Sequence, residues 1–192
     1  MRPRAAGAAR ATIGPVPAID PPTLCDGDLT LRPPVPGDAE AVTAACQDPA
    51  IQRWTFVPSP YRREHAEQWL AAAPERARAG EAVTLLAFDG DDRLVGSFSL
   101  MEIDFDRGYA EIGYWVAAEA RGRGVATRAT RLLHGWARDG LGLTRLEILP
   151  HAGNAPSRRV AERCGYVATG ELRKAPRGGD RDPVYVVYAW EA

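Results

Sequence analysis

The sequence predicts an α+β fold in which helices flank a mixed sheet, and three observations favour this class. Residues 83–88 and 94–100 are apolar and partly β-branched, and the turn sequence between them predicts an antiparallel hairpin. A strand-like segment, a glycine turn and an amphipathic helix then follow one another near the centre of the chain. The chain has 192 residues, enough for one compact core without disulfides or a structural metal.

The N-terminal segment differs in composition from the rest. Residues 1–24 are rich in Ala, Pro and Arg, and they offer too few large apolar side chains to offset the entropy of ordering them. We expect a disordered tail there and a single domain over residues 25–192. No apolar run approaches the ~20 residues of a membrane span, and no signal-peptide core follows the first arginines. The expectation is a soluble, unsecreted protein without membrane contact.

Charge and cysteine content exclude several classes of partner. A formal net charge of -1 from 24 basic and 25 acidic residues gives no footprint for nucleic acid. Cys25, Cys46 and Cys164 are odd in number and widely spaced, which favours neither a disulfide framework nor a zinc site and fits a reducing cytoplasm. The 3 histidines have no carboxylate or cysteine beside them at metal-ligand spacing, so we expect no metal.

Four segments are expected before the hairpin: a strand over 28–32, a short helix over 38–47, a short helix or loop over 48–60 and a helix over 61–73. The strand ends at Pro33, because proline lacks the N–H that a sheet ladder needs. Pro74 is expected to kink or restart the helix that precedes it. Trp54 and Phe56 either expose an aromatic wall for a substrate or join the core.

After the hairpin we expect a strand over 109–116, a helix from Val125 to Gly140, a strand over 143–149, a helix from Asn154 to Gly165 and a final hairpin of 166–172 with 184–190. Gly140 is suited to close the first of these helices. Asn154 is a good N-cap and Pro156 lies in the first turn of the second helix, which Gly165 stops.

The glycine turn before Val125 has the chemistry of a phosphate site. A helix N-terminus carries unpaired N–H groups and the positive end of the macrodipole, so it attracts an anion. Gly122 and Gly124 keep side chains away, Arg121 and Arg123 add positive charge, and Thr127 adds a hydroxyl. A plain flexible turn remains the alternative. The dinucleotide and P-loop patterns do not match, because Thr127 occupies the third glycine position and no Gly-Lys-Ser/Thr follows.

Two motifs resemble those of one family. The segment Arg121-x-x-Gly124-x-Ala126 resembles the R/Q-x-x-G-x-G/A motif of the GNAT superfamily of N-acetyltransferases. The second motif resembles the RimJ/RimL-like branch and reads Asn154-x-x-Ser157-x-x-Val160-x-Glu162-Arg163-x-Gly165-Tyr166. The resemblance covers roughly residues 28–190 and implies a GNAT-type, mostly antiparallel central sheet, splayed between its fourth and fifth strands and flanked by helices.

The resemblance also implies a binding site for acetyl-CoA in the splayed gap. Trp115 and Val116 would offer backbone groups to pantetheine, and Asn154 and Ser157 would border the thioester. The pyrophosphate would be held by Arg121, Gly122, Arg123, Gly124, Val125, Ala126 and Thr127.

Acetyl transfer requires a neutral amine, so a base is expected beside the acceptor. Glu111 is the first candidate for this base and for acceptor binding, since the resemblance implies a catalytic glutamate on this strand and alternation puts it on the face of Gly113 and Trp115. A solvated or arginine-paired glutamate is the alternative. Glu147, on the next strand, is the second choice.

The resemblance implies a further catalytic role for Ser157, as proton donor to the departing thiolate. Its hydroxyl could instead only satisfy backbone donors in the first helical turn. Tyr166 is a second candidate acid, although its place after Gly165 favours packing at a strand start.

The predicted function is transfer of an acetyl group from acetyl-CoA to a primary amine by direct attack in a ternary complex. The acceptor is expected to be a protein N-terminal α-amine or, alternatively, a small-molecule amine such as an antibiotic, polyamine or amino acid. A noncatalytic acyl-CoA-binding module is the third hypothesis. Apart from the amine acceptor, we expect no binding to nucleic acid or to a membrane. The protein is expected to be a monomer or a homodimer.

Overall fold

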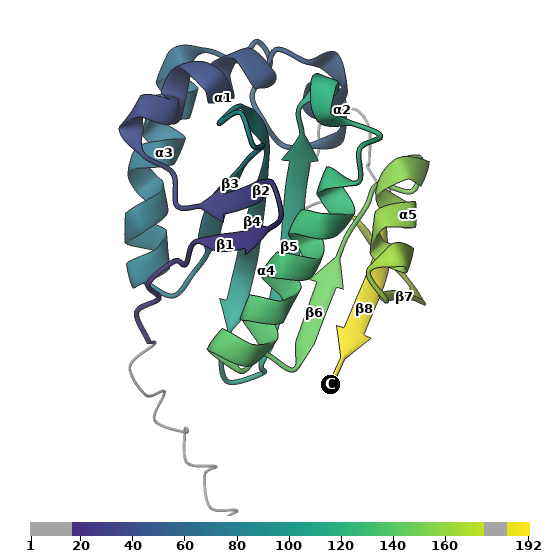
Figure 1. Cartoon of the computed structure of the whole chain (residues 1–192). Helices are drawn as coiled ribbons and strands as arrows, with labels where there is room; N and C mark the ends of the chain where they lie inside the picture. The colour runs from purple at the N-terminus through teal and green to yellow at the C-terminus, as the bar shows by residue number, and fades with distance from the viewer. Residues whose placement is uncertain (1–16, 175–183) are drawn as a thin grey trace, which may run out of the picture.

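The structure, a computed structural model, describes residues 17–174 and 184–192. Its strands form one sheet in the order β1-β2-β3-β4-β5-β6-β8-β7 (Figure 1). The strands are β1 (Leu24–Asp26), β2 (Leu29–Arg32), β3 (Val83–Phe88), β4 (Leu94–Asp104), β5 (Tyr109–Val116), β6 (Arg145–Ile148), β7 (Val167–Lys174) and β8 (Val184–Glu191). Neighbours are antiparallel except β5 and β6, which are parallel. The predicted mixed, mostly antiparallel sheet is confirmed.

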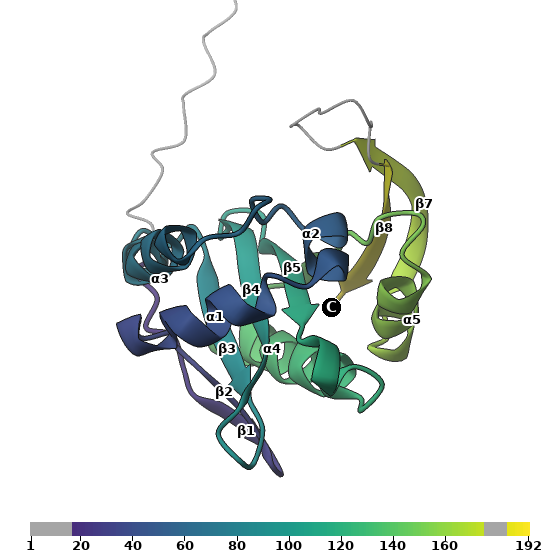
Figure 2. The same ribbon diagram turned by 90° about the horizontal axis from the view of Figure 1, so that it is seen from above.

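Helices cover both faces of this sheet. They are η1 (Pro36–Asp38), α1 (Ala39–Ala45), α2 (Pro49–Trp54), α3 (Arg63–Arg78), η2 (Ala118–Ala120), α4 (Val125–Leu141) and α5 (Ala155–Arg163). Helix α4 lies across β4 and β5 on one face, and α5 lies beside the C-terminal strands (Figures 1 and 2). Helices α1 and α3 pack on the other face, as the core contacts below show.

Strand β3 shows why both faces are covered. All its residues are buried, and alternate side chains enter different clusters. Leu85 and Ala87 pack with the apolar face of α4, whereas Leu86 and Phe88 pack with α1 and α3. The continuous apolar run of this strand is therefore the sequence signature of a strand with a helix layer on each side.

The sheet opens between β5 and β6, which are the fourth and fifth of the predicted strands because β1 was not predicted, and the expected position of the opening is confirmed. Their pairing is limited to Tyr109–Glu111 with Arg145–Glu147, although β5 continues to Val116. Beyond Glu111, β5 pairs with β4 alone. Strands β5 and β6 diverge from there (Figure 1). Alternate backbone groups of this part of β5 consequently face the gap. The N-terminus of α4 and the start of α5 lie at the carboxyl ends of these two strands.

Two segments in the N-terminal half differ from what the sequence predicts. The predicted tail is too long, because Ile19 is 5% exposed and its N–H donates to the Ala77 carbonyl at 3.0 Å; residues 1–16 lie outside the described part. Residues 24–26 add strand β1, joined to β2 through Gly27 at a φ of 58°. A strand of 3 residues is too short to show a recognisable alternation of apolar and polar side chains, and it forms only because β2 pairs with it.

Two predicted helix boundaries also differ. Helix α3 does not restart at Pro74 but continues to Arg78, because Ala66, Leu70, Ala73 and Ala77 bury one face on both sides of the proline. Helix α4 continues to Leu141, and its C-cap is Gly142 rather than Gly140, in the left-handed region at a φ of 70°. Tertiary packing explains why α3 continues past Pro74. The end of α4 differs because Gly140 and Gly142 are both suited to a C-cap and the helix uses the second.

Candidate active site

The loop between β5 and α4 presents a row of unpaired backbone donors. Within the described residues, the amides of residues 122–127 donate to no other protein group, and the first paired amide is that of Arg128, bonded to the Gly124 carbonyl. Gly122 and Gly124 adopt φ values of 76° and 78°, a conformation that favours glycine. A Cβ at either position would meet no atom within 4 Å, so the space before the loop is open. The arrangement suits a bound anion such as a diphosphate.

The Arg121 side chain is hydrogen-bonded to two groups of the protein itself. Its guanidinium donates to Asp48 at 2.8 and 3.2 Å and to the Val116 carbonyl at 3.1 Å, and its backbone N–H is bonded to Ala118. The hydrogen bond from Arg121 holds the pKa of Asp48 below its ordinary value. Arg121 thus fastens the loop to Asp48, the N-cap of α2, and the unpaired amides begin at the residue that follows it.

The end of β5 offers fewer backbone groups to the gap than predicted. The Trp115 carbonyl lies beside Gly96 of β4, and the Val116 carbonyl already accepts from Arg121. Backbone groups alternate in direction along a strand, so the Val116 N–H is the one that faces away from β4. Contact of this segment with pantetheine remains a prediction that rests on the Val116 N–H.

Asn154 and Ser157 stand at the start of α5, across the gap from β5. The Asn154 side chain accepts from the Ser157 N–H at 3.2 Å, so the cap role is present. The Ser157 hydroxyl is hydrogen-bonded to the hydroxyl of Tyr114 at 2.8 Å, which joins α5 to β5. Burial raises the pKa of Tyr114 to about 12, so both hydroxyls keep their protons near neutral pH. The pair can donate one proton to a leaving group in the gap.

Glu111 lies on the face of β5 that was predicted for it. Its neighbours Ala110 and Ile112 are buried against α4, whereas Glu111 points to the opposite face with Trp115. The Glu111 carboxylate accepts from the Tyr109 hydroxyl at 3.3 Å, and 23% of the side chain is exposed. Burial raises the pKa of Glu111 above its ordinary value, which moves it toward the range useful for a base.

Glu147 is a buried anion with a full set of donors, which argues against its role as a base. Its side chain is 1% exposed and accepts from Arg145 at 2.6 Å, Arg173 at 2.6 Å and the Tyr109 hydroxyl at 3.0 Å. Burial alone would raise its pKa, but these hydrogen bonds hold the pKa below its ordinary value. Neither Tyr109 nor Arg173 was among the predicted site residues. The period of two along a strand puts Tyr109 on the face of Glu111 and could have identified Tyr109.

Aromatic side chains join α2 to the C-terminal strands. The Trp54 ring lies 5.1 Å from that of His151, and His151 lies 5.8 Å from Tyr185. Phe56 is 69% exposed and lies 6.1 Å from Tyr185. Both aromatic residues proposed as a substrate wall therefore belong to one cluster with His151 and Tyr185, neither of which the sequence analysis selected.

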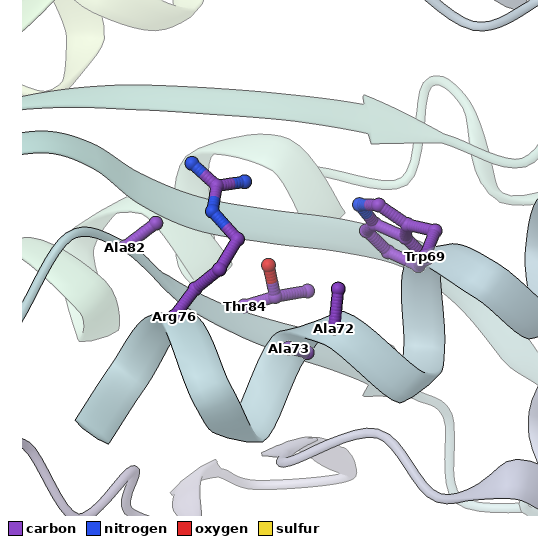
Figure 3. Close-up of a pocket in the computed structure, with 6 residues that line it drawn as sticks. All are labelled: Trp69, Ala72, Ala73, Arg76, Ala82 and Thr84. Atoms are coloured by element: carbon purple, nitrogen blue, oxygen red, sulfur yellow. The ribbon is translucent and has the colours of Figure 1, made fainter. Parts of the chain in front are cut away.

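Two hollows lie on the side of α1 and α3. A cavity of about 50 Å³ lies between α3 and β3 and is lined in part by Trp69, Arg76 and Thr84 (Figure 3). A hollow of about 280 Å³ lies between α1 and η2, where Asp48 and Glu119 line it. In the described ranges, no His, Cys, Asp or Glu cluster has a metal-site arrangement, and no helix is long and apolar enough to cross a membrane.

Residues 28–167 match a family model described as "Acetyltransferase (GNAT) domain". Over 88 residues the chain is 42% identical to the "Putative ribosomal N-acetyltransferase YdaF" of Bacillus subtilis (strain 168), a match that covers 46% of this chain and 47% of that protein. The chain therefore spans about half the length of this relative.

Two solved structures share the fold. The RimL ribosomal L7/L12 α-N-protein acetyltransferase in complex with coenzyme A has a TM-score of 0.79 at 21% identity, over 88% of this chain and 98% of that one. The microcin C7 self-immunity acetyltransferase MccE in complex with acetyl-CoA and AMP has a TM-score of 0.79 at 22% identity, over 87% and 94%. At these identities the likeness concerns the fold.

Proposed function

The chain belongs to the GNAT acetyltransferase family, and from this membership we propose that it transfers an acetyl group from acetyl-CoA to a primary amine by direct attack in a ternary complex. The observation that carries the proposal is the row of unpaired amides of residues 122–127 at the start of α4, next to the opening between β5 and β6. A helix N-terminus of this kind can bind a diphosphate without a metal.

Acetyl-CoA, when bound, supplies the acetyl group as a thioester. The amides of residues 122–127 would hold its pyrophosphate, because they are unpaired and the space beside Gly122 and Gly124 is open. The Val116 N–H would bind the pantetheine, and Ser157 would border the thioester. Arg121 would act on this site through the loop that it fastens to Asp48.

Glu111 would take the proton from the attacking amine, directly or through water. At pH 7, deprotonation costs on the order of 4 to 5 kcal/mol for a lysine-like amine of pKa ~10.4, but only ~1 to 1.5 kcal/mol for an α-amine of pKa ~8. The raised pKa of Glu111 supports this role, because it reduces the difference between the pKa of the Glu111 carboxyl and the pKa of the attacking amine. The Ser157 hydroxyl, bonded to Tyr114, would donate its proton toward the leaving sulfur.

A protein N-terminal α-amine is the acceptor that we propose. The lower cost of deprotonating an α-amine supports it, as does the similarity to a relative whose name describes a ribosomal N-acetyltransferase. The aromatic cluster of Trp54, Phe56, His151 and Tyr185, between α2 and β8, would form one wall of the acceptor site.

The test is release of free CoA thiol from acetyl-CoA with a panel of N-terminal peptides, polyamines and aminoglycosides. We expect turnover with peptides. Turnover confined to polyamines or aminoglycosides would replace the acceptor class by small amines. Binding of CoA without thiol release for any amine would contradict the transferase proposal and favour a noncatalytic acyl-CoA-binding module.

A further inference from the structure

We propose that Arg173, in the C-terminal hairpin, is a positioning residue for Glu111: its guanidinium is anchored on the buried Glu147 and stands beside the Glu111 carboxylate, which it keeps ionised for amine deprotonation. The inference rests on the proposed function, because it assumes that Glu111 is the base. It assigns a role to a residue outside the two sequence motifs.

The contacts of Arg173 place one nitrogen between two carboxylates. Its Nη1 lies 2.6 Å from Glu147 and 3.7 Å from Glu111, and it is also 3.4 Å from the Tyr109 hydroxyl. Its Nε donates to Glu171 on the same strand at 2.8 Å. The side chain is therefore held from both sides and is only 33% exposed. Its charge reaches Glu111 from a fixed position.

The other groups around Glu111 act mostly in the opposite direction. Glu102 of β4 and Glu147 of β6 are like charges, and burial also disfavours the ionised carboxylate. Tyr109, on β5 itself, donates a hydrogen bond that favours the ionised form. Among the described residues, Arg173 is the cation that forms an ion pair with Glu111. Without it, Glu111 should hold its proton to a higher pH.

Arg145 provides a matched control for this inference. It also donates to Glu147 at 2.6 Å, but it forms an ion pair with Glu191 and has none with Glu111. Loss of either arginine removes one guanidinium from Glu147, so general damage to the buried network should be similar in Arg173→Gln and Arg145→Gln. Only Arg173→Gln removes the charge beside Glu111.

The experiment measures two quantities in both variants and in Arg173→Lys. The first is the pH dependence of kcat/KM for thiol release; the second is the carboxyl titration of Glu111 by carbon-13 NMR in the free protein, assigned with Glu111→Gln. For Arg173→Gln we expect the acidic limb and the Glu111 titration to move up by about one pH unit. Arg145→Gln should leave both in place, and Arg173→Lys should restore them largely.

Equal shifts in the two glutamine variants, or an unmoved Glu111 titration in Arg173→Gln, would overturn the inference. The two readouts also separate this inference from the proposed function. If the wild-type protein acetylates no amine, the proposed function fails, while the titration still shows whether Arg173 controls the ionisation of Glu111.

Discussion

Glu111 and Glu147 lie on neighbouring strands, yet their surroundings push their pKa values apart. Burial dominates at Glu111 and raises its pKa, whereas hydrogen bonds from Arg145, Arg173 and Tyr109 lower that of Glu147. A pair of carboxyl groups with diverging pKa values is a common basis for dividing chemical roles. This divergence supports the proposal that Glu111 transfers the proton while Glu147 keeps its negative charge.

The substitution Glu111→Gln should lower kcat/KM by about 100-fold or more, because it removes the proposed base while keeping the side-chain shape. The measurement is thiol release across pH 6 to 9 with the best amine, at matched acetyl-CoA concentrations. Full activity of this variant across that range would rule out Glu111 as the base.

The substitution Glu147→Gln should lower stability by roughly 1 to 3 kcal/mol, because it removes the buried anion that Arg145 and Arg173 share. The cost stays moderate because both guanidinium groups are about one-third exposed and keep Glu191 and Glu171 as partners. A carboxyl group with a lowered pKa stabilises the fold at pH values above its unfolded-state pKa, near 4.3. This stabilisation is lost as the pH falls through the folded-state pKa. The wild-type free energy of unfolding, from urea titrations, should therefore fall on acidification below about pH 4.5. A glutamine variant with the same acid limb would contradict this account.

At the scale of elements, the conformation of the loop before α4 determines the direction of the unpaired backbone amides of residues 122–127. Both glycines lie in the left-handed region, and neither is needed for space, since a Cβ would meet nothing within 4 Å. The conformation alone requires them. The loop also depends on Arg121, which ties it to the cap of α2 and thus to the segment that ends in Trp54.

Gly124→Ala and Gly135→Ala form a test with opposite signs. Gly124 has a φ of 78°, so alanine should cost about 1 kcal/mol and weaken CoA binding by disturbing the loop. Gly135 lies inside α4 with open space around its Cβ position, so alanine should stabilise by roughly 0.5 to 1 kcal/mol and leave CoA binding unchanged. Thermal unfolding and CoA titration measure both; equal effects of the two changes would refute the role of the loop conformation.

The features that sequence predicted are those encoded locally. The order strand, glycine turn, helix and the cap at Asn154 depend on neighbouring residues, and the structure has both. Arg173 could not be selected in this way, because its contact with Glu147 joins residues 26 positions apart through the strand order. Strand β1 and the burial of Ile19 likewise depend on partners that lie elsewhere in the chain.

At the scale of the molecule, two parts of the sheet meet at a short parallel pairing and separate above it. Contacts across the opening come from side chains: the hydroxyls of Tyr114 and Ser157, and the ion pair of Arg173 with Glu111. The opening leads to the unpaired amides of residues 122–127. The proposed reaction thus requires both parts of the sheet, with the proposed pyrophosphate site on the N-terminal side and the proposed proton donor on α5.

The most direct test of the central claim is a crystal structure of the protein with coenzyme A. The account predicts pyrophosphate oxygens at hydrogen-bond distance from the amides of residues 122–127, about 2.7 to 3.2 Å, with the pantetheine arm between β5 and β6. Coenzyme A bound elsewhere, or these amides turned toward protein acceptors, would contradict the account.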